Sequence, residues 1–145
     1  MSQKSERPTM EKPSWAGELE RVTMGEFGEP RPPVYKAAYV IALMNQLKAE
    51  IHETAVSKGW WDEPREVGTL IALIHSELSE GLEAAREDLP DDKLPDFSGL
   101  EVELADAIVR ILDMAAAMEL QVVEAMMEKV KLNKTRAYRH GGKAF

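Results

Sequence analysis

Apolar residues recur at helical spacing through most of this chain, and that spacing constrains the fold more than any other feature. In the segment 65–88, apolar side chains fall on one face of a helix when successive residues are placed about 100° apart. The segments 34–58, 98–118 and 121–134 are also predicted to be helical. No segment alternates convincingly between apolar and polar residues, as a half-buried strand would. We therefore predict an all-α fold, a helical bundle of about four main helices.

Residues that end or begin helices separate these segments. Gly59 follows the first helical segment and is a favourable helix stop. The connection 89–96, between the second and third segments, is interrupted by prolines. Ser98 with Glu101 three residues later has the pattern of a capping box. The third helix is therefore expected to begin at about Ser98.

The N-terminal segment differs from the rest of the chain. A chain of 145 residues is expected to form one domain. Residues 1–33 hold five of the 8 prolines and show no sustained periodicity. We interpret 1–33 as an extended, proline-rich arm and 34–145 as the folded domain. The sequence shows no apolar leader and no run long enough to span a membrane, so a cytoplasmic protein without a membrane partner is expected.

Composition excludes several classes of function. The chain has no cysteine, which rules out disulfides, thiolate metal sites and thiol nucleophiles. Its 26 acidic residues against 18 Lys and Arg give a formal charge of -8, which argues against a protein that coats a nucleic-acid duplex. An acidic chain that handles phosphates needs metal ions between itself and its ligand.

Two pairs of acids border the apolar faces of the second and third predicted helices. Glu77 and Glu80 form one pair, and Glu103 and Asp106 form the other. Residues three apart are neighbours on a helix surface. If the two helices pack as an antiparallel hairpin, four carboxylates meet in one small volume. Such a group requires a compensating charge, and Mg²⁺ prefers carboxylate oxygens.

Other interpretations of these acids were considered. A single pair of this kind is usually a solvated helix face, whereas for two pairs that border the apolar faces of successive helices a metal site and a solvated face are equal alternatives. A ferritin-like di-iron centre needs two Glu-x-x-His motifs, and the residue three before each of the 3 histidines is alanine. The sequence also lacks a His-Glu-x-x-His zinc motif, a P-loop and a Gly-x-Gly-x-x-Gly turn.

The acidic pattern resembles that of a known family. Glu77-Leu-Ser-Glu80 followed by Glu103-Leu-Ala-Asp106 resembles the E-x-x-E … E-x-x-D signature of the MazG-like, all-α nucleoside triphosphate pyrophosphohydrolases. The likeness to the compact, single-domain branch extends to 58–62, to 74–80 and to the basic C-terminal segment that begins at Lys129. It covers the chain from about residue 34 onward and leaves out the arm.

The resemblance implies an activity, a metal and an assembly. Members hydrolyse a nucleoside or deoxynucleoside triphosphate to the monophosphate and pyrophosphate, commonly to clear non-standard or surplus nucleotides. They use Mg²⁺, with Mn²⁺ as a substitute, held by the four acids. Their helical core is completed by oligomerisation, as homodimers or homotetramers. Two alternatives stay open: a narrow dUTPase or dCTPase, and a non-catalytic nucleotide-binding helical module.

Further roles also follow from the resemblance. Glu77 and Glu80 are candidates for activating water, and the pattern does not settle whether these, another of the four acids or neighbouring Glu83 does so. The resemblance places phosphate contacts at Lys129, Asn133 and Arg136, although basic residues at a helix end also suit the helix dipole. Trp60 and Trp61 are candidates for base stacking, and the alternative is that at least one of them anchors the connection between the first two helices in the core. Tyr138 is assigned either to a lid over the phosphates or to a frayed terminus.

Overall fold

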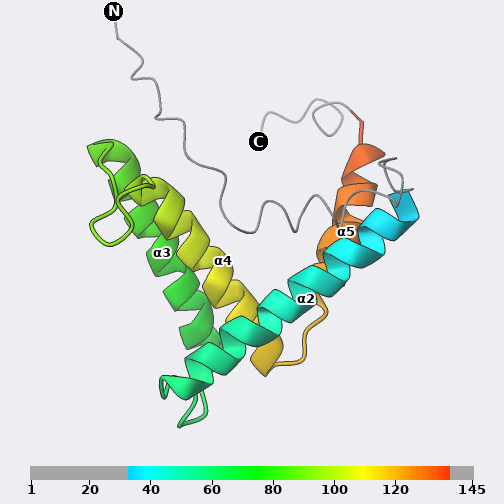
Figure 1. The fold of residues 1–145 in the computed structure, drawn as a ribbon, viewed down its shortest axis with the longest axis horizontal. Helices are drawn as coiled ribbons and strands as arrows, with labels where there is room; N and C mark the ends of the chain where they lie inside the picture. Colours follow the sequence, from blue (N-terminus) through cyan, green and yellow to red (C-terminus); the bar gives the residue numbers. More distant parts are fainter. Residues whose placement is uncertain (1–32, 138–145) are drawn as a thin grey trace, which may run out of the picture. The chain divides into compact units, whose positions relative to one another are not determined.

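The described part of the chain consists of helices and their connections. The computed structural model describes residues 33–137, with side chains from residue 37 onward. It contains α2 (Pro33–Ser57), α3 (Val67–Glu87), α4 (Gly99–Ala117) and α5 (Val122–Lys134) (Figure 1). Within residues 33–137 the β pairing is limited to an isolated bridge between Pro90 and Ser98. The predicted all-α class is thus confirmed.

The chain divides into two units, residues 1–40 and 41–145, and the second holds every feature described below. Most of the predicted arm, residues 1–32, lies outside the described residues. Among the residues that the structure describes, no helix has the length and apolar character needed to cross a membrane.

The helix ends follow from local chemistry, as the sequence predicted. After α2, Gly59 adopts a φ of 80°, a left-handed conformation that glycine accepts without a steric penalty. The capping box before α4 is present: the Ser98 hydroxyl accepts from the backbone N–H of Glu101, and the Glu101 carboxylate accepts from the backbone N–H of Ser98. These contacts satisfy amide groups that the first turn of α4 cannot pair.

α3 and α4 lie side by side as an antiparallel hairpin (Figure 1). Glycine permits the close approach: a Cβ placed on Gly81 would lie 3.4 Å from the Cβ of Glu103, and one on Gly99 would lie 3.1 Å from that of Ala84. The packing brings the middle of α3 against the first half of α4. The hairpin on which the predicted acidic site depends is therefore formed.

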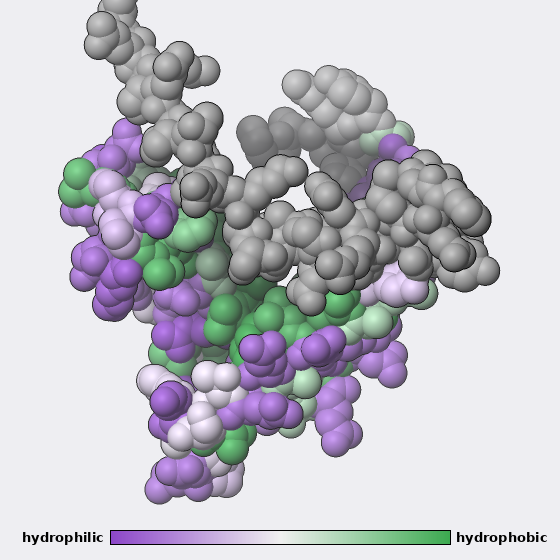
Figure 2. Space-filling view, in the orientation of Figure 1, coloured by the Kyte–Doolittle hydropathy of each residue, from purple (hydrophilic) through white to green (hydrophobic). Residues whose placement is uncertain are grey.

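The core of the described residues is small. Leu70, Ile74 and Met114 form its central cluster, and Trp61 packs against it. Eight large apolar residues of the hairpin remain 37% to 56% exposed: Val67, Ile71, Leu78, Leu82, Leu100, Leu104, Ile108 and Ile111. Hydrophobic surface is visible over the helices in Figure 2. Soluble monomers rarely leave so much contiguous apolar surface open to water, so this face is suited to a protein partner.

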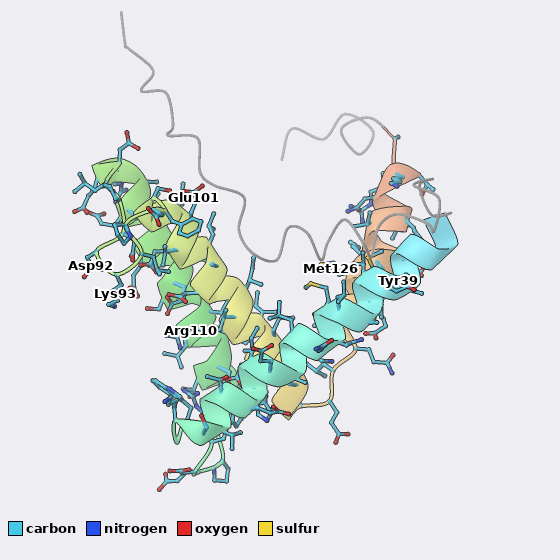
Figure 3. The ribbon with its side chains drawn as sticks, in the orientation of Figure 1. Tyr39, Asp92, Lys93, Glu101, Arg110 and Met126 are labelled. Atoms are coloured by element: carbon cyan, nitrogen blue, oxygen red, sulfur yellow. The ribbon has the colours of Figure 1, made fainter. Side chains whose placement is uncertain are left out.

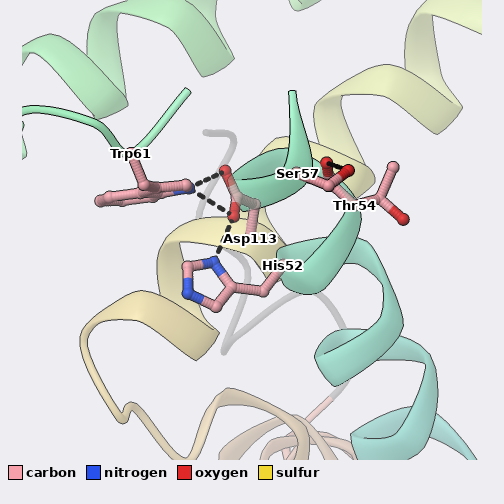
Figure 4. Close-up of polar contacts among 5 residues, drawn as sticks. All are labelled: His52, Thr54, Ser57, Trp61 and Asp113. Atoms are coloured by element: carbon pink, nitrogen blue, oxygen red, sulfur yellow. Dashed lines mark hydrogen bonds and ion pairs between the residues drawn. The ribbon is translucent and has the colours of Figure 1, made fainter. Parts of the chain in front are cut away.

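A polar cluster joins α2, the connection after it and α4. The indole N–H of Trp61 donates to both carboxylate oxygens of Asp113, at 3.0 and 3.1 Å (Figure 4). Nδ1 of His52 lies 2.8 Å from one of the same oxygens. The rings of His52 and Trp61 also meet edge to face, with centroids 5.3 Å apart. We call these three residues the Asp113 cluster; it holds the end of α2 against α4.

Candidate metal site

Three of the four predicted acids converge between α3 and α4. Glu77, Glu80 and Glu103, here called the acid triplet, each offer a carboxylate oxygen, and these oxygens all lie within 4.8 Å of one another. Glu77 is only 5% exposed, Glu103 is half-buried and Glu80 faces solvent. The hydroxyl of Ser76 donates to Glu80 at 2.9 Å. The i, i+3 spacing of the first pair and the close helix packing together produce the triplet.

The buried carboxylate of the triplet has a cationic partner. Nε of Arg110, a residue of α4 that Figure 3 labels, donates to Oε1 of Glu77, on α3, at 2.6 Å. The Glu77 side chain is 7% exposed and that of Arg110 is 35% exposed. A buried carboxylate without a partner is very costly, so this ion pair accounts for one of the three charges.

The remaining charges oppose one another. Burial raises the pKa of the Glu103 carboxyl above its ordinary value, and the negative charge of Glu80 raises it further. The charge of Glu77, a hydrogen bond with it and the charge of Asp106 act in the same direction. One arginine does not cancel three converging carboxylates, so without another cation the triplet favours uptake of a proton.

The ligand chemistry of the triplet fits a hard divalent cation. All the offered atoms are carboxylate oxygens, which suit Mg²⁺ and Mn²⁺ rather than a thiolate- or imidazole-seeking metal. A divalent cation among them would supply positive charge at the place where burial and the neighbouring acids raise the pKa of Glu103. Glu77, Glu80 and Glu103 are therefore the residues that would hold the predicted metal.

Asp106 lies outside the triplet. It is exposed and lines a cavity of about 280 Å³ between the end of α2 and α4, here called the α2–α4 cavity. The charged and aromatic residues that line this cavity are Lys58, Trp60, Arg65, Asp106, Arg110 and Asp113. Arg110 lines this cavity and contacts Glu77 at 2.6 Å, so the cavity adjoins the triplet.

A larger cavity of about 530 Å³ lies farther along α4. It is lined by residues that include Asn45 and His52 from α2, Ala116 from α4 and Glu124 from α5. Ala116 lies about 20 Å from Glu103 along the helix axis, at a rise of about 1.5 Å per residue. The α2–α4 cavity is thus the nearer of the two to the acid triplet.

The structure uses the two adjacent tryptophans differently. Trp61, one of the two predicted stacking residues, packs on the core and donates to Asp113, as expected of an anchor for the connection after α2. Trp60 is 56% exposed and lines the α2–α4 cavity, where the guanidinium of Arg65 lies 5.6 Å from the centroid of its ring. The exposed aromatic face beside the acids therefore belongs to Trp60.

The predicted phosphate contacts lie at the other end of the chain. Lys129 and Asn133 are exposed on α5, and Arg136 is exposed just after it. None of the three lines either of the two cavities described above. Within one chain the structure does not bring them to the acid triplet, so their role stays a prediction. Tyr138 and the basic residues after it lie outside the described residues.

Sequence reasoning missed two residues that complete this region. Arg110 follows Asp106 by four positions and Glu103 by seven, which places all three on the same face of α4. Asp113 continues the same row. A helical wheel that recorded cations as well as acids would have shown Arg110 beside the acids, although its bond to Glu77 depends on the position of α3.

Comparison of the chain with models of protein families, with curated proteins and with solved structures found no match.

Proposed function

We propose that this protein is a Mg²⁺-dependent nucleoside triphosphate pyrophosphohydrolase. One observation carries the proposal: the carboxylates of Glu77, Glu80 and Glu103 converge with a single arginine to balance them. The MazG-like pattern of the acids supports the same reaction. In it, water attacks a phosphorus of the triphosphate and yields a nucleoside monophosphate and pyrophosphate. Removal of surplus or non-standard nucleotides is the biological role most consistent with that pattern.

Different residues of the chain bind the metal, accept the proton and contact the phosphates in this reaction. Bound Mg²⁺ would neutralise phosphate oxygens and lower the pKa of water, so that a nucleophile forms at neutral pH. Glu77, Glu80 and Glu103 hold it, and Asp106 adds negative charge next to them. Exposed Glu80 is the member of the triplet best placed to accept a proton from the attacking water. Lys58 and Arg65, in the adjoining cavity, supply cations for the phosphates.

We also propose that a second copy of the chain covers the exposed apolar face of the hairpin. Four of the exposed apolar residues of α4 recur every three or four positions and so form one stripe: Leu100, Leu104, Ile108 and Ile111. A stripe of this kind is the usual seam between packed helices. Light scattering is expected to give at least twice the monomer mass, and a monomer at working concentration would contradict this assembly.

The function is tested with a panel of standard and modified triphosphates in the presence of Mg²⁺. The expected products are monophosphate and pyrophosphate, and omission of the metal should abolish their release. Glu80→Gln should reduce turnover by more than about 10²-fold with an unchanged circular-dichroism spectrum, because it removes a charged ligand from the metal.

Glu128→Gln is the matched control for this substitution. Glu128 is an exposed carboxylate on α5 that pairs with Lys131, so the same chemical change there should leave turnover unaffected. Full activity in Glu80→Gln, or triphosphate binding without any product under Mg²⁺ or Mn²⁺, would contradict the proposed function. The second result would indicate a nucleotide-binding module.

A further inference from the structure

Arg110 takes part in two neighbouring features of the molecule. Its Nε holds the buried Glu77 of the acid triplet at 2.6 Å, and the same side chain lines the α2–α4 cavity (Figure 3). A guanidinium has five N–H donors in a planar fork. Donation from Nε to Glu77 therefore leaves the two terminal NH₂ groups to contact a further anion.

The contact with Glu77 conflicts with metal binding. Oε1 of Glu77, the atom that accepts from Arg110, belongs to one of the three carboxylates that converge on the candidate metal site. A guanidinium in this position occupies a lone pair of that carboxylate and repels an incoming divalent cation. The free energy of the Arg110–Glu77 ion pair must therefore be overcome when a metal binds to the triplet.

The α2–α4 cavity offers Arg110 an alternative contact when phosphate is present. Lys58 and Arg65 line this cavity of about 280 Å³ together with Arg110, so three cations face it alongside the carboxylates of Asp106 and Asp113. Arg110 both lines this cavity and lies 2.6 Å from Glu77, so a phosphate in the cavity would lie beside the acid triplet. Arginine binds phosphate oxygens in a bidentate manner that lysine does not reproduce.

We propose that Arg110 substitutes for the metal in the free protein and contacts the phosphates of the substrate in the loaded one. Without metal, the guanidinium neutralises buried Glu77 and preserves the hairpin. When a divalent cation occupies the triplet, Arg110 leaves Glu77 and turns its fork to the phosphates in the α2–α4 cavity, beside Lys58 and Arg65. The proposal rests on the proposed function and names the residue that couples metal binding to substrate binding.

The proposal predicts that loss of Arg110 changes the two affinities in opposite directions. Arg110→Met should bind Mn²⁺ about tenfold more tightly than the unaltered protein at pH 8, because no internal cation competes for Glu77. The same variant should bind a non-hydrolysable deoxynucleoside triphosphate about tenfold more weakly at saturating Mn²⁺, because a charged contact to phosphate is lost. Isothermal titration calorimetry measures both affinities without reference to turnover.

Two further variants complete the experiment. Arg86→Met removes an arginine from an exposed pair with Glu83 on α3, and it should change neither affinity. Arg110→Lys keeps a positive charge beside Glu77 and should therefore fold. It provides the test of phosphate binding if Arg110→Met does not fold. The Mn²⁺ affinity of Arg110→Lys should differ little from that of the unaltered protein. Its triphosphate affinity should still fall, because an ammonium cannot make the bidentate contact.

The outcomes separate this proposal from the proposed function. If the unaltered protein binds Mn²⁺ and Arg110→Met binds it equally or more weakly, Arg110 is a structural partner of Glu77 and the inference is wrong, whereas the metal site stands. If Arg110→Lys retains full triphosphate affinity, the phosphate contact is likewise wrong. If the unaltered protein binds no Mn²⁺ at all, the proposed function itself fails.

Discussion

The acid triplet and the Asp113 cluster both place carboxylates between helices, yet their surroundings differ. Asp113 accepts from the Trp61 indole through both of its oxygens and contacts His52, so a single carboxylate has two partners. In the triplet, three carboxylates converge beside Arg110, and burial, followed by the charges of Glu80 and Glu77, raises the pKa of Glu103. A carboxylate whose partners match its charge stabilises the fold, whereas an unmatched group of carboxylates indicates a binding site for a cation.

The largest expected effect on stability comes from the matched carboxylate. Asp113→Ala leaves the half-buried indole N–H of Trp61 without its acceptor and removes the contact with Nδ1 of His52, and each lost partner costs free energy. We expect the free energy of unfolding to fall by about 3 kcal/mol in urea titrations. The exposed Asp92→Ala is the control and should be neutral. If Asp113→Ala is as stable as the unaltered protein, the Asp113 cluster does not stabilise the fold.

An intermediate effect is expected at the boundary between the two regions. Asp106 lies outside the triplet but raises the pKa of Glu103, so its charge acts on the same volume. Asp106→Asn should weaken Mn²⁺ binding about tenfold, or about 1.4 kcal/mol, because the charge of the acidic group sets its affinity. Isothermal titration calorimetry measures the Mn²⁺ affinity, with Asp92→Asn as the control variant. Unchanged affinity would show that three acids suffice and that Asp106 serves the α2–α4 cavity alone.

The smallest expected effect is on stability and comes from the repulsion between the acids of the triplet when no metal is bound. The pKa of Glu103 is raised in the folded protein, so folding favours the protonated carboxyl. The stability that Glu103 contributes is therefore fully present below its unfolded pKa and is lost as the pH rises through its folded pKa. At pH 7.5 without metal, Glu103→Gln should therefore stabilise the protein by about 0.5 kcal/mol, as expected when like charges are separated. The gain should disappear near pH 4, about the ordinary pKa of a glutamate.

Glu124 is the control of opposite sign for this substitution. A hydrogen bond from Asn45, 2.7 Å long, lowers its pKa, with contributions from a backbone hydrogen bond and the charge of Lys48. Its stabilising effect is present above the unfolded pKa and is lost as the pH falls through the lowered folded pKa. Glu124→Gln should thus destabilise the protein at pH 7.5, in contrast to Glu103→Gln. Equal shifts in the same direction would contradict the distinction between a carboxylate whose pKa is lowered by folding and one whose pKa is raised.

The sequence by itself determined the local features of this protein. Helical periodicity, Gly59 and the Ser98 capping box predicted the four helices and their ends closely, because each depends on neighbouring residues and backbone geometry. The i, i+3 spacing of acids on two helices likewise predicted which faces carry carboxylates. These properties need no knowledge of how the helices pack.

Only the tertiary structure decided which of those residues meet. It joined Glu103 to Glu77 and Glu80 but left Asp106 at the rim of a cavity, and it paired Glu77 with an arginine that the sequence had not singled out. It also used Trp61 to anchor the connection after α2 and left Trp60 beside the acids. The physical reason is that these contacts join segments far apart in the chain. Helix register, the close approach at Gly81 and side-chain direction determine such contacts together, and periodicity along one helix encodes none of them.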